Sequence, residues 1–521
     1  MTKDRGEQDF REKSRVDECK GRVIESYGIE SSGVKTRVEI IEKDFMPFYK
    51  IVIPEVDVAT KALLDDIKER LIGAVDMNIG EVFDVNIMEE LRKEFSNDAG
   101  RLLSEDLPHL DPIVRNNFIL GLVHELLGLG DIEFLLDDNN LEEVVVNSAK
   151  EPIRIYHKKY GWLRTNITTE NEAAILNYAN TIARRVGREI STLNPLLDAH
   201  LFSGDRVNAT INPISTKGHT ITIRKFARDP WTATDFVNSK TVSSEVLALI
   251  WLVIQYEMNI IISGGTGSGK TSFLNICMPF IPPNHRIISI EDTRELQLPQ
   301  FLYWCPLTTR ERNPEGKGEV TMLDLLINSL RMRPDRIIMG EIRKQREAEV
   351  LFEAMHTGHS VYSTLHADSC AQTINRLTNP PISIPSSMLD AVHLNVVMFR
   401  DRRRGIRRVF EIGEFLPGLM GNRDELKYRP SILYKWEPRT DTVRPATEDV
   451  SIYEKVGSHT GLSTDEVKKD LELKKKVLDW MVKYAVRQVE DVGKVMNRYY
   501  VDKDSVIEVV EQDKGPQKLL E

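Results

Sequence analysis

Apolar residues change their spacing along the chain, and these changes predict its elements. Short apolar runs at 38–41 and 49–53 predict strand fragments, whereas residues 58–136 follow a helical period. One apolar stripe in this helical region consists of Leu63, Leu64, Ile67, Leu71 and Ile72. Such stripes are typical of helices that bury one face. We therefore expect a mobile N-terminal arm with short strands over 1–57 and a helical bundle over 58–131.

The pattern becomes mixed after residue 131. Residues 172–186 predict an amphipathic helix, and alternating positions at 206–211 and 220–226 are typical of antiparallel strands. These features predict an α+β domain over 132–230. The polar stretch that follows, 231–240, predicts a linker.

Short β-branched runs then alternate with helical segments. The runs at 258–263, 286–290, 336–340 and 360–364 predict strands, with helical segments between some of them. This alternation is typical of a mostly parallel sheet covered by helices. We expect an α/β domain with C-terminal helices over 241–521.

Composition and charge narrow the class of protein. The 521 residues are 41% hydrophobic and 29% charged, as in soluble globular proteins, and the formal net charge is −10. An acidic balance argues against a nucleic-acid partner. The four cysteines form no C-x-x-C pair, so neither a zinc site nor a disulfide framework is indicated. We find no signal peptide and no apolar run of transmembrane length, so we expect any membrane association to be peripheral.

One stretch carries clear chemistry. Its eight residues fit the pattern G-x-x-x-x-G-K-[ST] and are Gly264, Gly265, Thr266, Gly267, Ser268, Gly269, Lys270 and Thr271. A predicted strand precedes them and a predicted helix follows, as a phosphate-binding loop requires. Glycines allow the backbone to turn tightly and to aim N–H groups at phosphates, while Lys270 would neutralise phosphate charge. Because a Thr271 hydroxyl at this position would hold Mg²⁺, the stretch predicts binding of ATP and Mg²⁺.

Two acids and two histidines stand at the ends of predicted strands. Glu291 and Glu341 each follow a short apolar run, where an acid would lie near Mg²⁺ and an attacking water. A buried strand that ends in an acid is also common without any function. His359 and His366 lie at opposite ends of the 360–364 strand. They are either structural histidines or groups that sense the γ-phosphate or position water.

Arginines complete the candidate chemistry. In many phosphoryl-transfer enzymes a second subunit supplies an arginine that stabilises charge on the transferred group. Arg206 and Arg224, on strands before the phosphate loop, are candidates for this role, and ordinary surface arginines are the alternative. We interpret the charged run 400–404 as a solvated turn.

Four motifs now follow one another in order. Residues 264–271, 291–295, 330–341 and 357–367 resemble the Walker A, Asp-box, Walker B and His-box series of the type II/IV secretion ATPase superfamily. Within that superfamily, the residues at 330–335 and 377–381 are most similar to those of the archaeal branch, which serves archaella, type IV pili and secretion.

The resemblance implies a fold, an assembly and residue roles. It implies a RecA-like P-loop ATPase domain and a homohexamer that holds ATP between the two domains of its subunits. Arg206 and Arg224 match arginines that reach the nucleotide. Glu291 matches the proposed catalytic base, and Glu341 matches the Walker B acid that completes the Mg²⁺ site with Thr271. His359 and His366 match the His-box histidines. It also implies a cytoplasmic location at the inner face of the cell membrane, beside a polytopic membrane platform protein. The four-cysteine zinc insertion of some relatives is missing, so we expect no metal besides Mg²⁺.

Three functions remain to be compared. The leading interpretation is a hexameric ATP-hydrolysing motor that powers assembly, rotation or secretion by a type IV filament system. A RecA-like or conjugation-type nucleic-acid motor is the alternative, and the net charge of −10 speaks against it. A catalytically silent scaffold is disfavoured because Lys270, Thr271, Glu291 and Glu341 are all present. The sequence leaves the identity of the filament system open.

Overall fold

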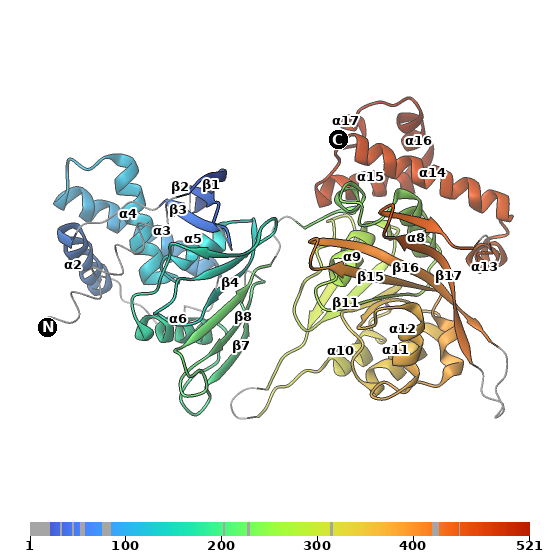
Figure 1. Cartoon of the computed structure of the whole chain (residues 1–521), viewed down its shortest axis with the longest axis horizontal. Coiled ribbons are helices and arrows are strands. Elements are labelled where there is room, and N and C mark those ends of the chain that lie inside the picture. The colour runs from blue at the N-terminus through green and yellow to red at the C-terminus, as the bar shows by residue number, and fades with distance from the viewer. Residues whose placement is uncertain are drawn as a thin grey trace. The chain divides into compact units, whose positions relative to one another are not determined.

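The computed structural model describes ten stretches of the chain. They are residues 21–31, 34–43, 46–52, 58–74, 85–201, 204–226, 230–312, 316–418, 427–447 and 449–520. The chain divides into two compact units, Met1–Arg228 (unit 1) and Asp229–Glu521 (unit 2), each with its own sheet and core (Figure 1). No helix in the described stretches is long and apolar enough to cross a membrane.

Unit 1 is built on a sheet of nine strands. In spatial order they are β1 (Val23–Ser31), β2 (Val34–Ile41), β3 (Phe48–Val52), β6 (Gly161–Thr165), β5 (Arg154–His157), β4 (Leu141–Val146), β9 (Thr220–Arg224), β8 (Arg206–Thr210) and β7 (Leu196–His200). Neighbouring strands are antiparallel except β3 and β6, which are parallel. The apolar side chains of α5 (Ile132–Asp137) and α6 (Glu172–Arg185) join those of the strands in one core.

Three further helices of unit 1 share a separate core. They are α2 (Val58–Ala74), α3 (Val85–Asp106) and α4 (Pro112–Leu127). Ile67, Phe95 and Leu103 are among the side chains buried between them. Helix α4 begins after Asp111, whose carboxylate accepts hydrogen bonds from the N–H groups of Ile113 and Val114.

The start of unit 1 differs from the sequence-based prediction. We expected a mobile arm ahead of the strand fragment at 38–41, but 23–31 form strand β1, antiparallel to β2. The Tyr27 hydroxyl donates to Asp138 Oδ2 at 2.7 Å. This partner is more than a hundred residues away, so the polar composition of the segment concealed a strand that tertiary contacts stabilise. Residues 1–20 of the predicted arm lie outside the described stretches.

Unit 2 is an α/β unit with a second sheet of nine strands. In spatial order they are β12 (Tyr303–Thr308), β11 (Arg286–Glu291), β13 (Arg336–Met339), β14 (Ser360–Leu365), β10 (Ile260–Gly264), β15 (Leu394–Asp401), β16 (Ile406–Pro417), β17 (Tyr428–Glu437) and β18 (Thr442–Pro445). The strands from β12 to β15 are parallel, and those from β15 to β18 pair antiparallel. Residues of β10, β11, β13 and β14 are almost fully buried, which explains the consecutive apolar residues in β10, β11 and β13.

Helices cover both faces of this sheet. One core joins it to α7 (Ala233–Asn238), α8 (Ser244–Gln255), α9 (Lys270–Cys277), α13 (Ser451–Thr460), α14 (Thr464–Lys483), α15 (Val489–Val501), α16 (Lys503–Glu511) and α17 (Gln517–Leu520). The other core joins it to α10 (Met322–Ser329), α11 (Gln345–His356) and α12 (Cys370–Thr378). Figure 1 shows these two helical layers above and below the strands of unit 2.

The predicted linker is part of unit 2. Residues 233–238 form helix α7, and a capping box between Thr232 and Asp235 begins it. Phe236 is 4% exposed and packs in the core of unit 2, against Phe273 of α9. This corrects the linker assignment for 231–240, because the polar residues that suggested a linker are the capping residues of a short, buried helix.

Candidate phosphate-binding site

The glycine-rich loop joins β10 to α9. Gly264, Gly267 and Gly269 have φ angles of 153°, 71° and 94°, which residues with a side chain rarely adopt. A Cβ on Gly264 would lie 2.5 Å from the carbonyl oxygen of Met398 and 2.5 Å from Ser268 Oγ. The backbone therefore takes the tight turn into a helix N-terminus that the motif predicts.

Lys270 is the first residue of α9, and its ammonium group folds back onto the loop. Its Nζ donates to the carbonyl oxygens of Gly264 at 3.0 Å and Gly265 at 3.1 Å. Burial lowers the pKa of Lys270, while the charges of Glu341 and Asp368 act in the opposite direction. In the described stretches no carboxylate forms an ion pair with Lys270, so its charge is available to an anion. A buried cation beside a helix N-terminus fits a phosphate group.

The strand order of unit 2 gathers the other candidates around this loop. Parallel strands have their carboxyl ends at one edge of the sheet, where ligands of open α/β sheets bind. Glu291 ends β11, Glu341 follows β13 by two residues, and His366 directly follows β14. The loop itself follows β10, which pairs with β14. Sequence-distant residues thus meet at a single edge.

Glu291 is buried, and only one of its two carboxyl oxygens accepts hydrogen bonds. Its Oε1 accepts hydrogen bonds from the N–H groups of Glu295 at 2.9 Å and Leu296 at 3.2 Å. Its Oε2 is buried and has no hydrogen-bond partner among the described residues. Burial raises the pKa of Glu291 to about 7, against the lowering effect of the two backbone N–H groups. A carboxyl group with one unpartnered oxygen and a pKa near neutrality is suited to accept a proton.

Glu341 has both oxygens engaged. Its Oε1 lies 2.9 Å from His366 Nε2, and its Oε2 accepts from Arg343 Nε at 2.8 Å and Nη2 at 2.7 Å. Arg343 Nη1 also lies 2.6 Å from Asp292 Oδ2. Burial, followed by the charge of Lys270, lowers the pKa of His366. Arg343 thus joins the end of β11 to the segment after β13, a contact that the sequence reasoning did not find.

The donor set suits Mg²⁺ on chemical grounds. Mg²⁺ prefers oxygen ligands and keeps several waters, so one hydroxyl and one carboxylate are sufficient from the protein. The Thr271 hydroxyl, in the first turn of α9, and the Glu341 carboxylate are oxygens at this edge that could supply them. Among the described residues no group of three or more His, Cys, Asp or Glu side chains is arranged to hold a metal ion.

His359 does not join this site. It precedes β14, whereas His366 follows it, and seven residues of extended chain span roughly 23 Å. Its ring Nδ1 lies 3.3 Å from the carbonyl oxygen of Ala354 and 3.3 Å from Thr357 Oγ1. As the sequence predicts, His359 therefore stands at the opposite end of β14 from His366, and its role as a His-box residue stays a prediction.

Arg206 and Arg224 lie side by side in unit 1. They are directly opposite each other on the antiparallel strands β8 and β9, and both are exposed. Arg206 forms a two-point ion pair with Asp198, with Nη2 2.7 Å from Oδ2 and Nε 3.2 Å from Oδ1. Arg206 is thus already paired with a carboxylate within unit 1, and the role of Arg206 and Arg224 at a nucleotide stays a prediction.

The structure adds two arginines that the sequence reasoning missed. Arg407 Nε, on β16, donates to the Gly267 carbonyl at 3.2 Å. Arg400, on β15, is so close that its Nη1 would lie 2.6 Å from a Cβ on Gly267. We interpreted the run around Arg400 as a solvated turn. The signal that identified Glu291, a charged residue at the carboxyl end of a buried strand, applies equally to Arg400.

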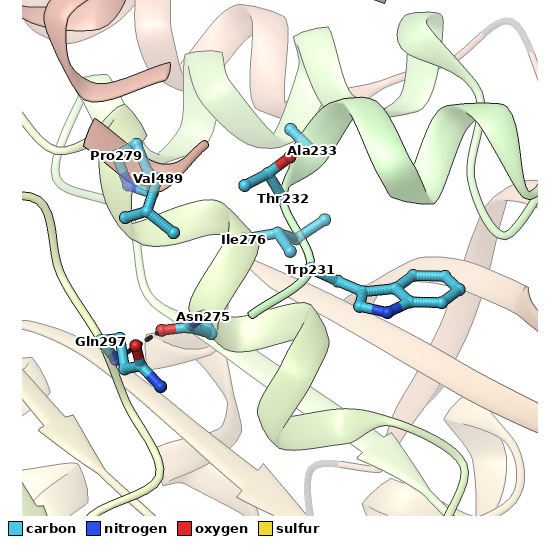
Figure 2. Close-up of a pocket in the computed structure, with 8 residues that line it drawn as sticks. All are labelled: Trp231, Thr232, Ala233, Asn275, Ile276, Pro279, Gln297 and Val489. Carbon is cyan, nitrogen blue, oxygen red and sulfur yellow. Dashed lines mark hydrogen bonds between the residues drawn. The ribbon is translucent and has the colours of Figure 1, made fainter. Parts of the chain in front are cut away.

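A small pocket of unit 2 lies apart from the loop. Figure 2 shows the residues that line it: Trp231, Thr232, Ala233, Asn275, Ile276, Pro279, Gln297 and Val489. The Asn275 Oδ1 atom accepts a hydrogen bond from the Gln297 N–H at 2.8 Å. None of the eight side chains is charged, and Asn275 is five residues beyond Lys270 in α9. The pocket therefore offers no counter-charge for a phosphate, and we do not assign it to the phosphate site.

Comparison with known proteins shows the family of the chain. The family model described as "Type II/IV secretion system protein" matches residues 126–401, from the end of α4 to the end of β15. The uncharacterized protein MJ0900 of Methanocaldococcus jannaschii is 37% identical over 399 residues, which are 75% of this chain and 71% of that protein. Type IV secretion system protein PtlH of Bordetella pertussis is 31% identical over 322 residues, with 53% of this chain and 91% of PtlH covered.

A solved structure is also similar. It is the VirB11 ATPase from the Brucella suis type IV secretion system, in complex with sulphate, with 26% identity, 54% of this chain and 90% of that chain covered, and a TM-score of 0.28. The region matched by the family model includes the glycine-rich loop, Glu291, Glu341 and His366. The chain belongs to the type II/IV secretion system protein family.

Proposed function

We propose that the chain is an ATPase that binds Mg·ATP at the glycine-rich loop of unit 2 and hydrolyses it. One observation carries the proposal. Lys270 of the loop is buried without an ion pair among the described residues, and Glu291 is buried with one unpartnered oxygen. Both lie at the same edge of the parallel sheet. The two groups supply what hydrolysis needs, which is a cradle for phosphate and an acceptor for a proton from water. Membership of the secretion family supports the same function.

Each residue then has a role. Lys270 and the loop N–H groups hold the β- and γ-phosphates, and Thr271 and Glu341 hold Mg²⁺, which neutralises charge on the phosphate oxygens when bound. Glu291 accepts the proton of the attacking water through Oε2. His366 orients the Glu341 carboxylate through its hydrogen bond.

We further propose that hydrolysis drives a motor. In this proposal six copies form a RecA-like hexamer in which Arg206 or Arg224 completes the nucleotide site of a neighbouring subunit. The motor acts in the cytoplasm at the inner face of the cell membrane. There it contacts a polytopic platform protein and powers assembly, rotation or secretion by a type IV filament system. The secretion family and the relative PtlH, named as a type IV secretion system protein, support this assignment.

Phosphate release by the full chain tests the ATPase proposal. We expect the Lys270→Ala variant to lose hydrolysis by at least about a hundredfold, because an electrostatic partner of the transferred phosphoryl group is removed. Lys476→Ala, an exposed lysine on α14, is the matched control and should retain the wild-type rate. A Lys270→Ala protein with normal turnover would refute the phosphate-loop assignment. Stimulation by membrane extract supports the motor, whereas stimulation by DNA alone identifies a nucleic-acid motor instead.

A further inference from the structure

Arginine side chains from the antiparallel part of the sheet contact the tip of the glycine-rich loop. Arg400 and Arg407 are directly opposite each other on β15 and β16. The Arg407 Nε donates to the Gly267 carbonyl at 3.2 Å, and its Cδ would lie 3.4 Å from a Cβ on Gly269. The stem of Arg407 therefore runs along the loop at two of its glycines, next to the start of α9.

Arg407 differs from neighbouring arginines in its partners. The next residue, Arg408, has its Nε 2.7 Å from Asp441 Oδ1, and Arg404 has its Nε 3.7 Å from Asp401 Oδ2. Within the described part of the chain Arg407 forms no ion pair, and the bond to Gly267 is the only hydrogen bond of its side chain. A guanidinium group has five N–H donors in one plane, so the bond from Nε leaves the Nη donors available.

We propose that Arg407 is a nucleotide-binding residue supplied by the same unit as the loop. Its Nε bond to Gly267 holds the loop in the conformation that binds, and its Nη groups donate to phosphate oxygens of the nucleotide. This proposal rests on the proposed ATPase function and deepens it. In this proposal Arg407 binds phosphate oxygens that ADP and ATP share, so it acts equally on the bound substrate and on the transition state. It therefore sets affinity and leaves the rate of the bound complex unchanged.

Calorimetric titration of the full chain with Mg·ADP, together with steady-state hydrolysis of Mg·ATP, tests the assignment. Arg407→Ala should weaken Mg·ADP binding by about tenfold or more, the loss expected for a charge-assisted hydrogen bond. The KM for ATP should rise by the same factor, and kcat should stay within about twofold, as for uniform binding. Arg407→Lys keeps the charge with fewer donors and should bind with intermediate affinity, a graded rescue that loss of folding would not produce.

Arg403→Ala is the matched control. Arg403 lies on the turn between the same two strands and is exposed, so its removal changes the charge equally and should leave Mg·ADP affinity unchanged. Wild-type affinity in a folded Arg407→Ala protein would overturn the assignment, as would a loss confined to kcat. A wild-type chain that binds no Mg·ADP would instead refute the proposed function itself, so the two failures are distinguishable.

Discussion

At the scale of single residues, Glu291 combines burial with an unpartnered oxygen. Because burial raises its pKa from 4.5 to about 7, the folded state holds a proton that the unfolded state releases between these pH values. Stability should therefore fall as the pH rises through this range, by up to about 3 kcal/mol. In Glu291→Gln the buried charge cannot form, so its melting temperature relative to wild type should rise from pH 5 to pH 8. Melting curves without nucleotide check this, and a constant difference across the range would contradict it. The same variant should bind Mg·ATP but not hydrolyse it.

At the scale of elements, the strand-to-helix turn at Gly264 depends on the neighbouring strand. A Cβ at Gly264 meets the backbone oxygen of Met398 on β15 at 2.5 Å, which no side-chain motion relieves. Gly461, at the end of α13, also has a positive φ, 77°, but a Cβ there meets nothing within 4 Å. We expect Gly461→Ala to cost only backbone strain, about 1 kcal/mol, and to keep Mg·ADP binding. Gly264→Ala should lower the melting temperature further and abolish binding. Equal effects in melting and titration experiments would mean that the loop can shift away from β15.

At the scale of the whole molecule, the proposed site draws on two units. Arg206 and Arg224 belong to unit 1, whereas Lys270 belongs to unit 2. If either arginine acts on a neighbouring subunit, its replacement by Ala should leave Mg·ATP binding intact and slow hydrolysis by about a thousandfold, as for an arginine finger. A mixture of Arg224→Ala and Lys270→Ala subunits, each inactive alone, should then regain activity, because some interfaces combine an intact arginine with an intact loop. Phosphate release in mixtures of varied ratio measures this. If mixed oligomers of either arginine variant with Lys270→Ala recovered no activity, the proposal of a site shared between subunits would be refuted.

The sequence by itself determined the local features of this protein. The glycine-rich loop is recognisable because its backbone conformation requires glycine at fixed positions, as the φ angles of Gly264 and Gly269 show. The buried parallel strands are recognisable because both of their faces are covered, so apolar residues follow one another directly in strands such as β10 and β13. Capping signals also act locally, as in the capping box between Ser463 and Glu466 that begins α14.

Only the tertiary structure decided which of these features meet. The order β12-β11-β13-β14-β10-β15 brings Glu291, Glu341 and His366 to one edge of the sheet. Apolar spacing reports how deeply a strand is buried but not which strand lies beside it. Arg407 escaped notice for the same reason, since its role depends on β16 lying next to the strand that borders the loop. Strand β1 and helix α7 were misread because their polar residues have partners elsewhere in the fold, and such partners depend on the packing of the whole unit.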